Sequence, residues 1–124
     1  MDSKQSVSLQ RKTIFCDIDG TIFWHQEKLS YMTIGNGSTT ENARLILGDW
    51  HDKDYYIILT TSRPESTRTK TESQLLTNGI FYDKLIMGLP RGCRVVINDR
   101  KPDGMVTAEA YCIERNKGLG EVNL

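Results

Sequence analysis

The stretch TIFCDIDGTIF, residues 13–23, decides the fold that the rest of the chain has to fit. β-Branched and aromatic residues lead up to Asp17 and Asp19, and Gly20 and Thr21 follow at once. A short apolar run that ends in turn residues is typical of a buried strand. This strand ends at two carboxylates that are separated by one residue. Their negative charges repel each other, so their pairing suggests a function.

Five runs of residues predict strands. They are residues 12–17, YYIILT at 55–60, LIM at 85–87, RVVIN at 94–98 and, more weakly, AEAYCI at 108–113. Near-continuous apolar runs of this kind fit parallel strands that are covered on both faces.

Helical patterns separate the first three of these strands. In STTENARLILGDW, Thr39 or Thr40 could cap a helix whose inward residues would be Ala43, Ile46, Leu47 and Trp50. In PESTRTKTESQLLTNGI, Pro64 suits the first turn, Asn78 and Gly79 suit the end, and the inward residues would be Leu75 and Leu76. This alternation predicts an α/β fold with a mainly parallel sheet. The connection from 88 to 93 is short for a link between two parallel strands, because such a crossover normally needs a dozen or more residues.

Length and composition predict a single cytoplasmic domain over residues 1–124. Lys plus Arg and Asp plus Glu both number 16, which gives no general attraction to nucleic acid or anionic membrane. No apolar run is long enough to span a bilayer, and the first residues lack the apolar core of a secretory signal. The three scattered cysteines suit a reducing compartment and form neither a disulfide framework nor a zinc motif.

Polar clusters follow three of the predicted strands. They are residues 17–21, residues 60–63, and Asn98 and Asp99 with Asp103 beyond them. The carboxyl ends of parallel strands meet at one edge of a sheet, where ligands bind. We therefore expect three segments that are distant in sequence to form one site.

Three interpretations of the first cluster compete. Asp and Gly are ordinary turn residues, but a turn does not explain the other two clusters. A calcium loop of the EF-hand type would place Phe15 and Gln26 at ligand positions, which excludes it. The third interpretation is phosphoryl transfer at a divalent cation. Asp17 and Asp99 would hold Mg²⁺, Asp17 would attack phosphorus, and Asp19 would protonate the leaving oxygen and later activate water.

Three motifs resemble those of the haloacid dehalogenase (HAD) superfamily. FCDIDGT is similar to its first motif, IILTTSRPE to its second and VVINDRKPD to its fourth, so that the resemblance covers residues 12–104. It implies a Rossmann-like three-layer α/β sandwich with a five-stranded, mainly parallel sheet. It also implies dependence on Mg²⁺ and a phosphoaspartate at Asp17. Asp19 occupies the position where the family's phosphatases and phosphomutases carry Asp.

The resemblance also implies roles for neighbouring residues. Thr61 would bind the transferring phosphoryl group, although its hydroxyl could instead cap the following helix. The Asp19 carbonyl would bind Mg²⁺, and Asp103 would support Asp99 in the metal site. The residues that we place at the substrate phosphate are Gly20, Thr21, Ser62 and Arg63. Gly20 would let the backbone turn sharply and approach the phosphate.

The family's third motif, a Lys or occasionally an Arg, has no clean match in this sequence. Arg91 follows the predicted strand at 85–87, whereas Lys84 precedes that strand and would sit at its amino end. We therefore predict that Arg91 supplies the cation, with Lys84 and Lys101 as the other candidates.

The chain is too short for the cap domain that many family members insert. Residues from about 21 to 37 fit the short flap hairpin of the family, and Trp24, His25 and Tyr31 lie on it. The sequence thus predicts a capless, Mg²⁺-dependent phosphatase, with a phosphorylated sugar as substrate. The alternatives are a phosphatase of nucleotide or polynucleotide ends and a non-catalytic HAD-like binding module. We also expect a homo-oligomer, because an uncapped site is open to water.

Overall fold

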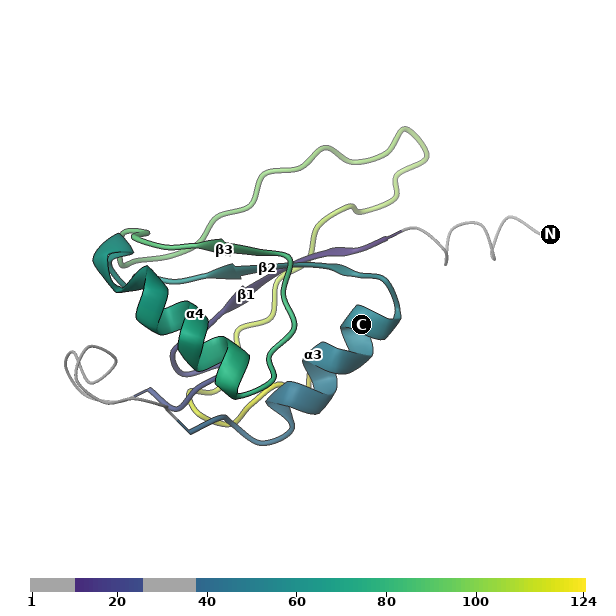
Figure 1. Ribbon diagram of the computed structural model, residues 1–124. Coiled ribbons are helices and arrows are strands. Elements are labelled where there is room, and N and C mark those ends of the chain that lie inside the picture. Colours follow the sequence, from purple (N-terminus) through teal and green to yellow (C-terminus); the bar gives the residue numbers. More distant parts are fainter. Residues whose placement is uncertain (1–10, 26–37) are drawn as a thin grey trace.

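The computed structural model describes residues 11–25 and 38–124 (Figure 1). In chain order the elements are β1 (Thr13–Asp17), α3 (Ala43–Asp52), β2 (Tyr56–Thr60), a 3₁₀ turn (Glu65–Thr67), α4 (Arg68–Thr77) and β3 (Lys84–Ile86). The strands form a parallel sheet in the order β1-β2-β3. The α/β prediction, the first three strands and both helices are confirmed.

Within the described residues, helices cover one face of the sheet. Along β1, Ile14 and Cys16 are buried while Phe15 is 58% exposed, and Ile86 on β3 is 41% exposed. Both α3 and α4 lie on the covered side (Figure 1), so the described chain forms two layers. The expectation of strands covered on both faces, and of three layers, is therefore wrong. An apolar strand sequence shows that its residues can be buried, not that a second layer is present to bury them.

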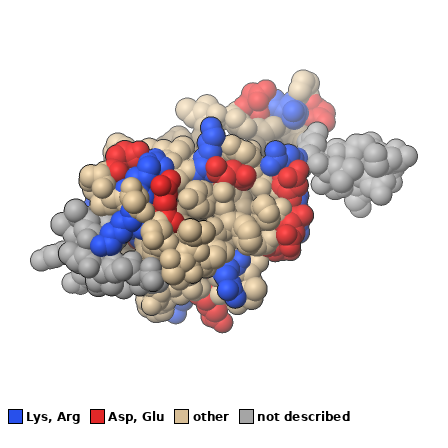
Figure 2. Space-filling model, viewed as in Figure 1, with Lys and Arg blue, Asp and Glu red and all other residues tan. Residues whose placement is uncertain are grey.

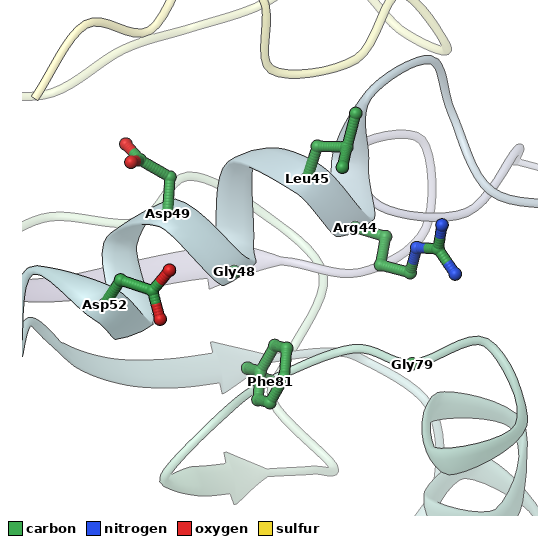
Figure 3. A pocket seen from close by; sticks show the side chains of 7 residues that line it. All are labelled: Arg44, Leu45, Gly48, Asp49, Asp52, Gly79 and Phe81. Atoms are coloured by element: carbon green, nitrogen blue, oxygen red, sulfur yellow. The ribbon is translucent and has the colours of Figure 1, made fainter.

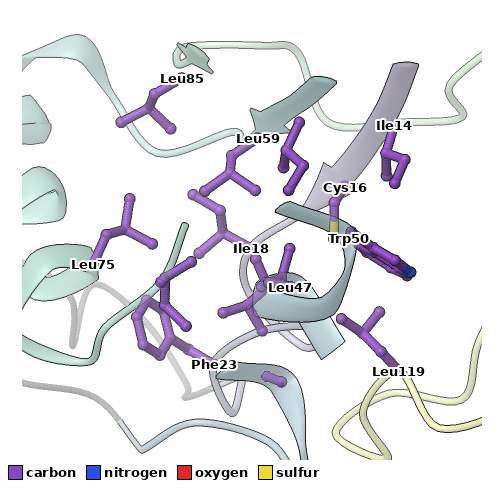
Figure 4. Close-up of a cluster of buried hydrophobic side chains, with 14 of the residues drawn as sticks. Ile14, Cys16, Ile18, Phe23, Leu47, Trp50, Leu59, Leu75, Leu85 and Leu119 are labelled. Carbon is purple, nitrogen blue, oxygen red and sulfur yellow. The ribbon is translucent and has the colours of Figure 1, made fainter. Parts of the chain in front are cut away.

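The hydrophobic core lies between the sheet and the two helices (Figure 4). It contains Leu47 and Trp50 from α3, Leu75 from α4 and Leu59 from β2, each at most 2% exposed. Leu119, near the end of the chain, closes the core beside α3. The C-terminal segment is thus anchored to the domain through Leu119.

Details of both helices differ from the prediction. The residue before α3 is Asn42, and Thr40 instead donates its hydroxyl to the carbonyls of Thr21 and Ile22, at 2.6 and 3.2 Å. Thr40 therefore ties the helix to the loop after β1 rather than capping the helix. On α4, Leu75 is buried but Leu76 is 81% exposed, so the expectation that both face the core is wrong for Leu76.

The predicted fourth and fifth strands do not form. Residues 94–98 and 108–113 contain no strand, and Val95, Val96 and Ile97 are exposed on a segment that extends away from the sheet (Figure 1). A fourth parallel strand would have to pair with the free edge of β1. After β3, the chain would therefore have to run back to the amino end of the sheet and pass β2 and β1. That path is about 20 Å, which is the limit of what six residues can span. The short connection explains the missing strand.

The flap prediction lies mostly outside the described residues. Within them, Phe23 forms isolated bridges with Asp19 and Thr39, which begins the excursion expected from residue 21. Residues 26–37, including Tyr31, are not described. Among the described residues, no helix is both long and apolar enough to cross a membrane.

Candidate active site

A tight loop presents the two carboxylates at the carboxyl end of β1. The Ile18 carbonyl accepts hydrogen bonds from the backbone N–H groups of Ile22 at 2.8 Å, Phe23 at 3.1 Å and Thr21 at 3.2 Å. Gly20 has a φ of +87°, a left-handed conformation that a side chain would strain. The loop therefore turns back on itself directly after Asp19, as the glycine predicted.

Asp17 carries a raised pKa. The main cause is desolvation of its carboxylate by the surrounding protein, although the residue as a whole is exposed. The negative charge of Asp19 also raises the pKa, whereas the Ile18 backbone N–H, the Arg94 charge and the Thr21 hydroxyl lower it. A partly desolvated carboxylate beside a second one attracts any cation that can reach it.

Asp19 is held by Arg63. The Arg63 guanidinium donates Nη2 to Asp19 Oδ1 at 2.8 Å and Nε to Oδ2 at 3.0 Å. Its side chain is 2% exposed, whereas that of Asp19 is 26% exposed. The sequence predicted Arg63 at the substrate phosphate, and in the structure its charge orients Asp19 from within the protein.

The inward face of α4 explains how an arginine can be buried at this point. Thr71 and Gln74, both buried, accept hydrogen bonds from Arg63 Nη1 at 3.1 and 2.7 Å. Phe23 lies 5.9 Å from the guanidinium carbon, in a cation–π contact. Among the described residues, every buried side-chain nitrogen and oxygen has a hydrogen-bond partner. Two inward polar residues one turn apart on α4 were the available sequence signal for this buried arginine.

The segment after β2 forms the opposite wall of the site. Thr60 pairs with Asp17 across the sheet, and Thr61, which is 1% exposed, follows it. The Thr61 backbone N–H donates to the Ile86 carbonyl at 3.0 Å. Its hydroxyl oxygen accepts the Arg63 N–H at 3.1 Å, so it stabilises the turn after β2.

Arg94 is the cation that sequence reasoning missed. Its guanidinium donates to the carbonyls of Pro90 and Gly92, at 2.9 and 3.0 Å, and to Ser62 Oγ at 3.4 Å. It is also the positive charge that lowers the pKa of Asp17. The motif comparison treated residue 94 only as the first residue of a strand, so no sequence signal marked it.

The sequence predicted Arg91 as the cation, with Lys84 and Lys101 as the other candidates, and all three are exposed. Arg91 is exposed on the loop that follows β3, and Lys84 is exposed at the amino end of that strand, as predicted. Lys101 is exposed at a turn in which its N–H donates to the Met105 carbonyl.

The predicted metal ligands are only partly brought together. Asp99 and Asp103 are exposed on the extended segment after β3. The described part of the chain contains no group of three or more His, Cys, Asp or Glu side chains arranged to hold a metal. The Asp17 carboxylate and the Asp19 carbonyl remain. Hard oxygen donors of this kind suit Mg²⁺, which uses one or two carboxylates and keeps several waters.

The C-terminal segment packs against the loop that follows β1. The Asn116 backbone N–H donates to the Gly20 carbonyl at 2.8 Å, and its side-chain oxygen accepts the His25 N–H at 2.7 Å. Trp24, beside His25, is half exposed. His25 thus contributes its backbone to this contact, and Asn116 supports the loop although no motif marked it.

A separate hollow lies between α3 and the chain that follows α4 (Figure 3). It is lined by Arg44, Leu45, Gly48, Asp49, Asp52, Gly79 and Phe81. None of these is a predicted site residue, and the carboxylate loop does not border it.

Comparisons with known proteins give structural likenesses only. No family model and no curated protein matches the sequence. A chain of the Pnkp1/Rnl/Hen1 RNA repair complex superposes with a TM-score of 0.55 and 26% identity, covering 70% of this chain and 27% of that one. A Vibrio cholerae crystal structure gives a TM-score of 0.51 and 17% identity, covering 77% of each chain. The first likeness supports a HAD-like fold, and the second shows a shared fold alone.

A third structure is D,D-heptose 1.7-bisphosphate phosphatase from B. bronchiseptica, complexed with magnesium and phosphate. Its TM-score is 0.48 at 15% identity, covering 78% of this chain and 55% of that one.

Proposed function

We propose that this protein is a Mg²⁺-dependent phosphomonoester hydrolase that acts through a phosphoaspartate at Asp17. The observation that carries the proposal is the arrangement around β1. A nucleophilic carboxylate, a second carboxylate fixed by Arg63, and Arg94 lie at one sheet edge. Acyl or glycosyl transfer does not need this combination, whereas phosphoryl transfer needs positioning and cations around a dianion.

Asp17 and the Asp19 carbonyl would hold Mg²⁺, which would offset repulsion between the carboxylates and the phosphate. The carboxylates Asp99 and Asp103 stay predicted ligands from the sequence. Among the protein cations, Arg94 is best placed to stabilise the transferring group, because it already acts on Asp17. Thr61, Thr21 and Ser62 would supply hydroxyls to the phosphate oxygens.

The chain's own residues account for both half-reactions. In the first, which Asp19 enters in its protonated form, an Asp17 oxygen bonds to phosphorus, the bond to the leaving oxygen breaks, and Asp19 gives that oxygen its proton. In the second, Asp19 takes a proton from water, whose oxygen attacks phosphorus and displaces Asp17. Phosphate leaves, and both carboxylates return to their starting states. Arg63 keeps Asp19 aligned through both steps.

The substrate that we propose first is a phosphorylated sugar. On the face shown in Figure 2, acidic and basic side chains lie side by side, and formal net charge is zero. This charge balance favours a small substrate over a long polyanion. A phosphorylated polynucleotide end is the second candidate, supported by the likeness to a chain of an RNA repair complex.

Release of p-nitrophenol from p-nitrophenyl phosphate, with and without Mg²⁺, tests the activity. We expect Mg²⁺-dependent release that Asp17→Asn abolishes and that Asp52→Asn, an exposed change on α3, leaves unchanged. A folded wild-type protein that releases nothing with any phosphomonoester would support the non-catalytic binding module instead.

A further inference from the structure

Arg115 lies beside the carboxylate loop, where no motif predicted a functional residue. Its side-chain stem covers Gly20: a methyl group at residue 20 would stand 3.3 Å from Arg115 Cγ and 3.9 Å from Cδ. The guanidinium lies at the end of that stem. The stem of Arg115 thus packs against the loop that carries Asp19.

The backbone around Arg115 is fixed on both sides. Asn116 is bonded to the Gly20 carbonyl and to the His25 N–H. Gly118, with φ +85°, packs so tightly that a methyl group there would be 2.6 Å from the Glu41 carbonyl oxygen. Leu119 is 3% exposed in the core. An arginine on such an anchored segment is positioned at low entropic cost, unlike one on a loose terminus.

The charge of Arg115 is not used within the described structure. Residue 115 is exposed, and among residues 11–25 and 38–124 no carboxylate forms an ion pair with it. Arg63, in contrast, is neutralised by Asp19. Arg94 and Arg115 are therefore the two arginines beside this loop whose charge a substrate can use.

These two arginines serve different positions. Arg94 acts on the nucleophile Asp17. Arg115 instead packs its side-chain stem over Gly20, on the turn that follows Asp19. A substrate held by both would carry one phosphate at Asp17 and a second anionic group on the side of Gly20.

We propose that Arg115 binds a second phosphate group of the substrate, so that the protein prefers phosphomonoesters that carry another phosphate nearby. This inference rests on the proposed function, because the first phosphate is placed by Asp17. An arginine fork suits a phosphate oxygen pair better than a single hydroxyl. Both substrate candidates can meet the requirement, as a sugar bisphosphate or as a nucleotide with two phosphates.

Two matched substrate pairs test the inference in wild type and Arg115→Gln. Adenosine 3′,5′-bisphosphate is compared with adenosine 3′-monophosphate, and glucose 1,6-bisphosphate with glucose 6-phosphate. We expect wild-type kcat/KM to be at least tenfold higher for the bisphosphate of one pair, and Arg115→Gln to reduce that ratio to below threefold. The pair that shows the effect identifies the source of the phosphate. Arg115→Lys should recover part of the ratio, and Lys117→Gln, which removes a charge two residues away, should keep it.

Binding gives a readout that does not need turnover. In an Asp17→Asn background, calorimetric titration with the same bisphosphates should show Kd rising at least fivefold on Arg115→Gln. Ratios and Kd values that do not respond to Arg115→Gln would overturn the inference while leaving the phosphatase proposal intact. Absence of hydrolysis with p-nitrophenyl phosphate and with all four adenosine and glucose phosphates would overturn the phosphatase proposal, and the titration would then decide the Arg115 site by itself.

Discussion

Arg63 and Asp19 form a two-point ion pair in which the arginine is the buried member and the carboxylate the accessible one. A buried guanidinium is retained only where its donors are satisfied, and Thr71 and Gln74 complete that set. The carboxylate consequently meets solvent and substrate in one orientation. This pairing makes Arg63 a positioning residue for the proposed acid and base.

The first prediction concerns Arg63→Lys, which keeps the charge and loses the fork. A single ammonium cannot bind both Asp19 oxygens and both α4 acceptors. We expect kcat to fall about tenfold or more for alkyl phosphates and less for p-nitrophenyl phosphate, whose leaving group needs little protonation. The free energy of unfolding in urea should fall by about 1–3 kcal/mol. Arg68→Lys, in a surface pair with Glu65, is the control. Equal losses for both substrates would argue against a role through Asp19.

The second prediction separates the two candidates for the missing cation. Arg94→Gln should lower kcat at saturating Mg²⁺ by tenfold or more, about 1.4 kcal/mol of transition-state stabilisation. Arg91→Gln, three residues earlier on the same loop, should be within about twofold of wild type, as should Lys84→Ala. A large loss for Arg91→Gln with little for Arg94→Gln would restore the prediction made from the sequence.

The sequence predicted the elements whose neighbours are close in the chain. β1, β2 and β3 each carry apolar strand residues and alternate with helical patterns, so their parallel pairing followed. The carboxylates were found because they end a strand. Burial on one face only was not predictable from apolar content, since Phe15 and Ile14 look alike in the sequence.

The parts that the sequence missed depend on tertiary neighbours. Arg63 follows a strand in a charged segment. Its guanidinium can be buried because Thr71 and Gln74 on α4 accept its hydrogen bonds. Arg94 and Arg115 have no motif, because their positions depend on the path of the chain after β3 and on the anchoring of Leu119. RVVIN has strand composition but no reachable partner.

The third prediction tests that exposed segment. Ile97 is 90% exposed, so Ile97→Ser should change the free energy of unfolding by less than about 0.5 kcal/mol. Leu59→Ala, at a fully buried position of β2, should cost about 2–5 kcal/mol in the same urea titrations. A loss for Ile97→Ser comparable to that of Leu59→Ala would mean that residues 94–98 are buried as the strand that their composition predicts.

The last prediction concerns the effect of the Asp17 charge on the free energy of unfolding. Asp17 has a pKa above its ordinary value of 3.8, with burial as the largest cause and the charge of Asp19 as a further one. Between the ordinary and the raised pKa the folded protein binds more protons at Asp17 than the unfolded chain does. Stability therefore falls as pH rises through that window, and the penalty persists at neutral pH.

Asp17→Asn removes this penalty together with the nucleophile. We expect a variant without phosphatase activity whose free energy of unfolding at pH 7, in the absence of Mg²⁺, equals or exceeds that of wild type. Its advantage should vanish as pH falls below about 3.8, where Asp17 is neutral in both states. Urea titrations at several pH values measure the difference, and Asp52→Asn, at an exposed site, should show no such pH dependence. A variant that is less stable than wild type at neutral pH would show that the Asp17 charge is compensated in the fold, and that burial and repulsion do not dominate at this carboxylate.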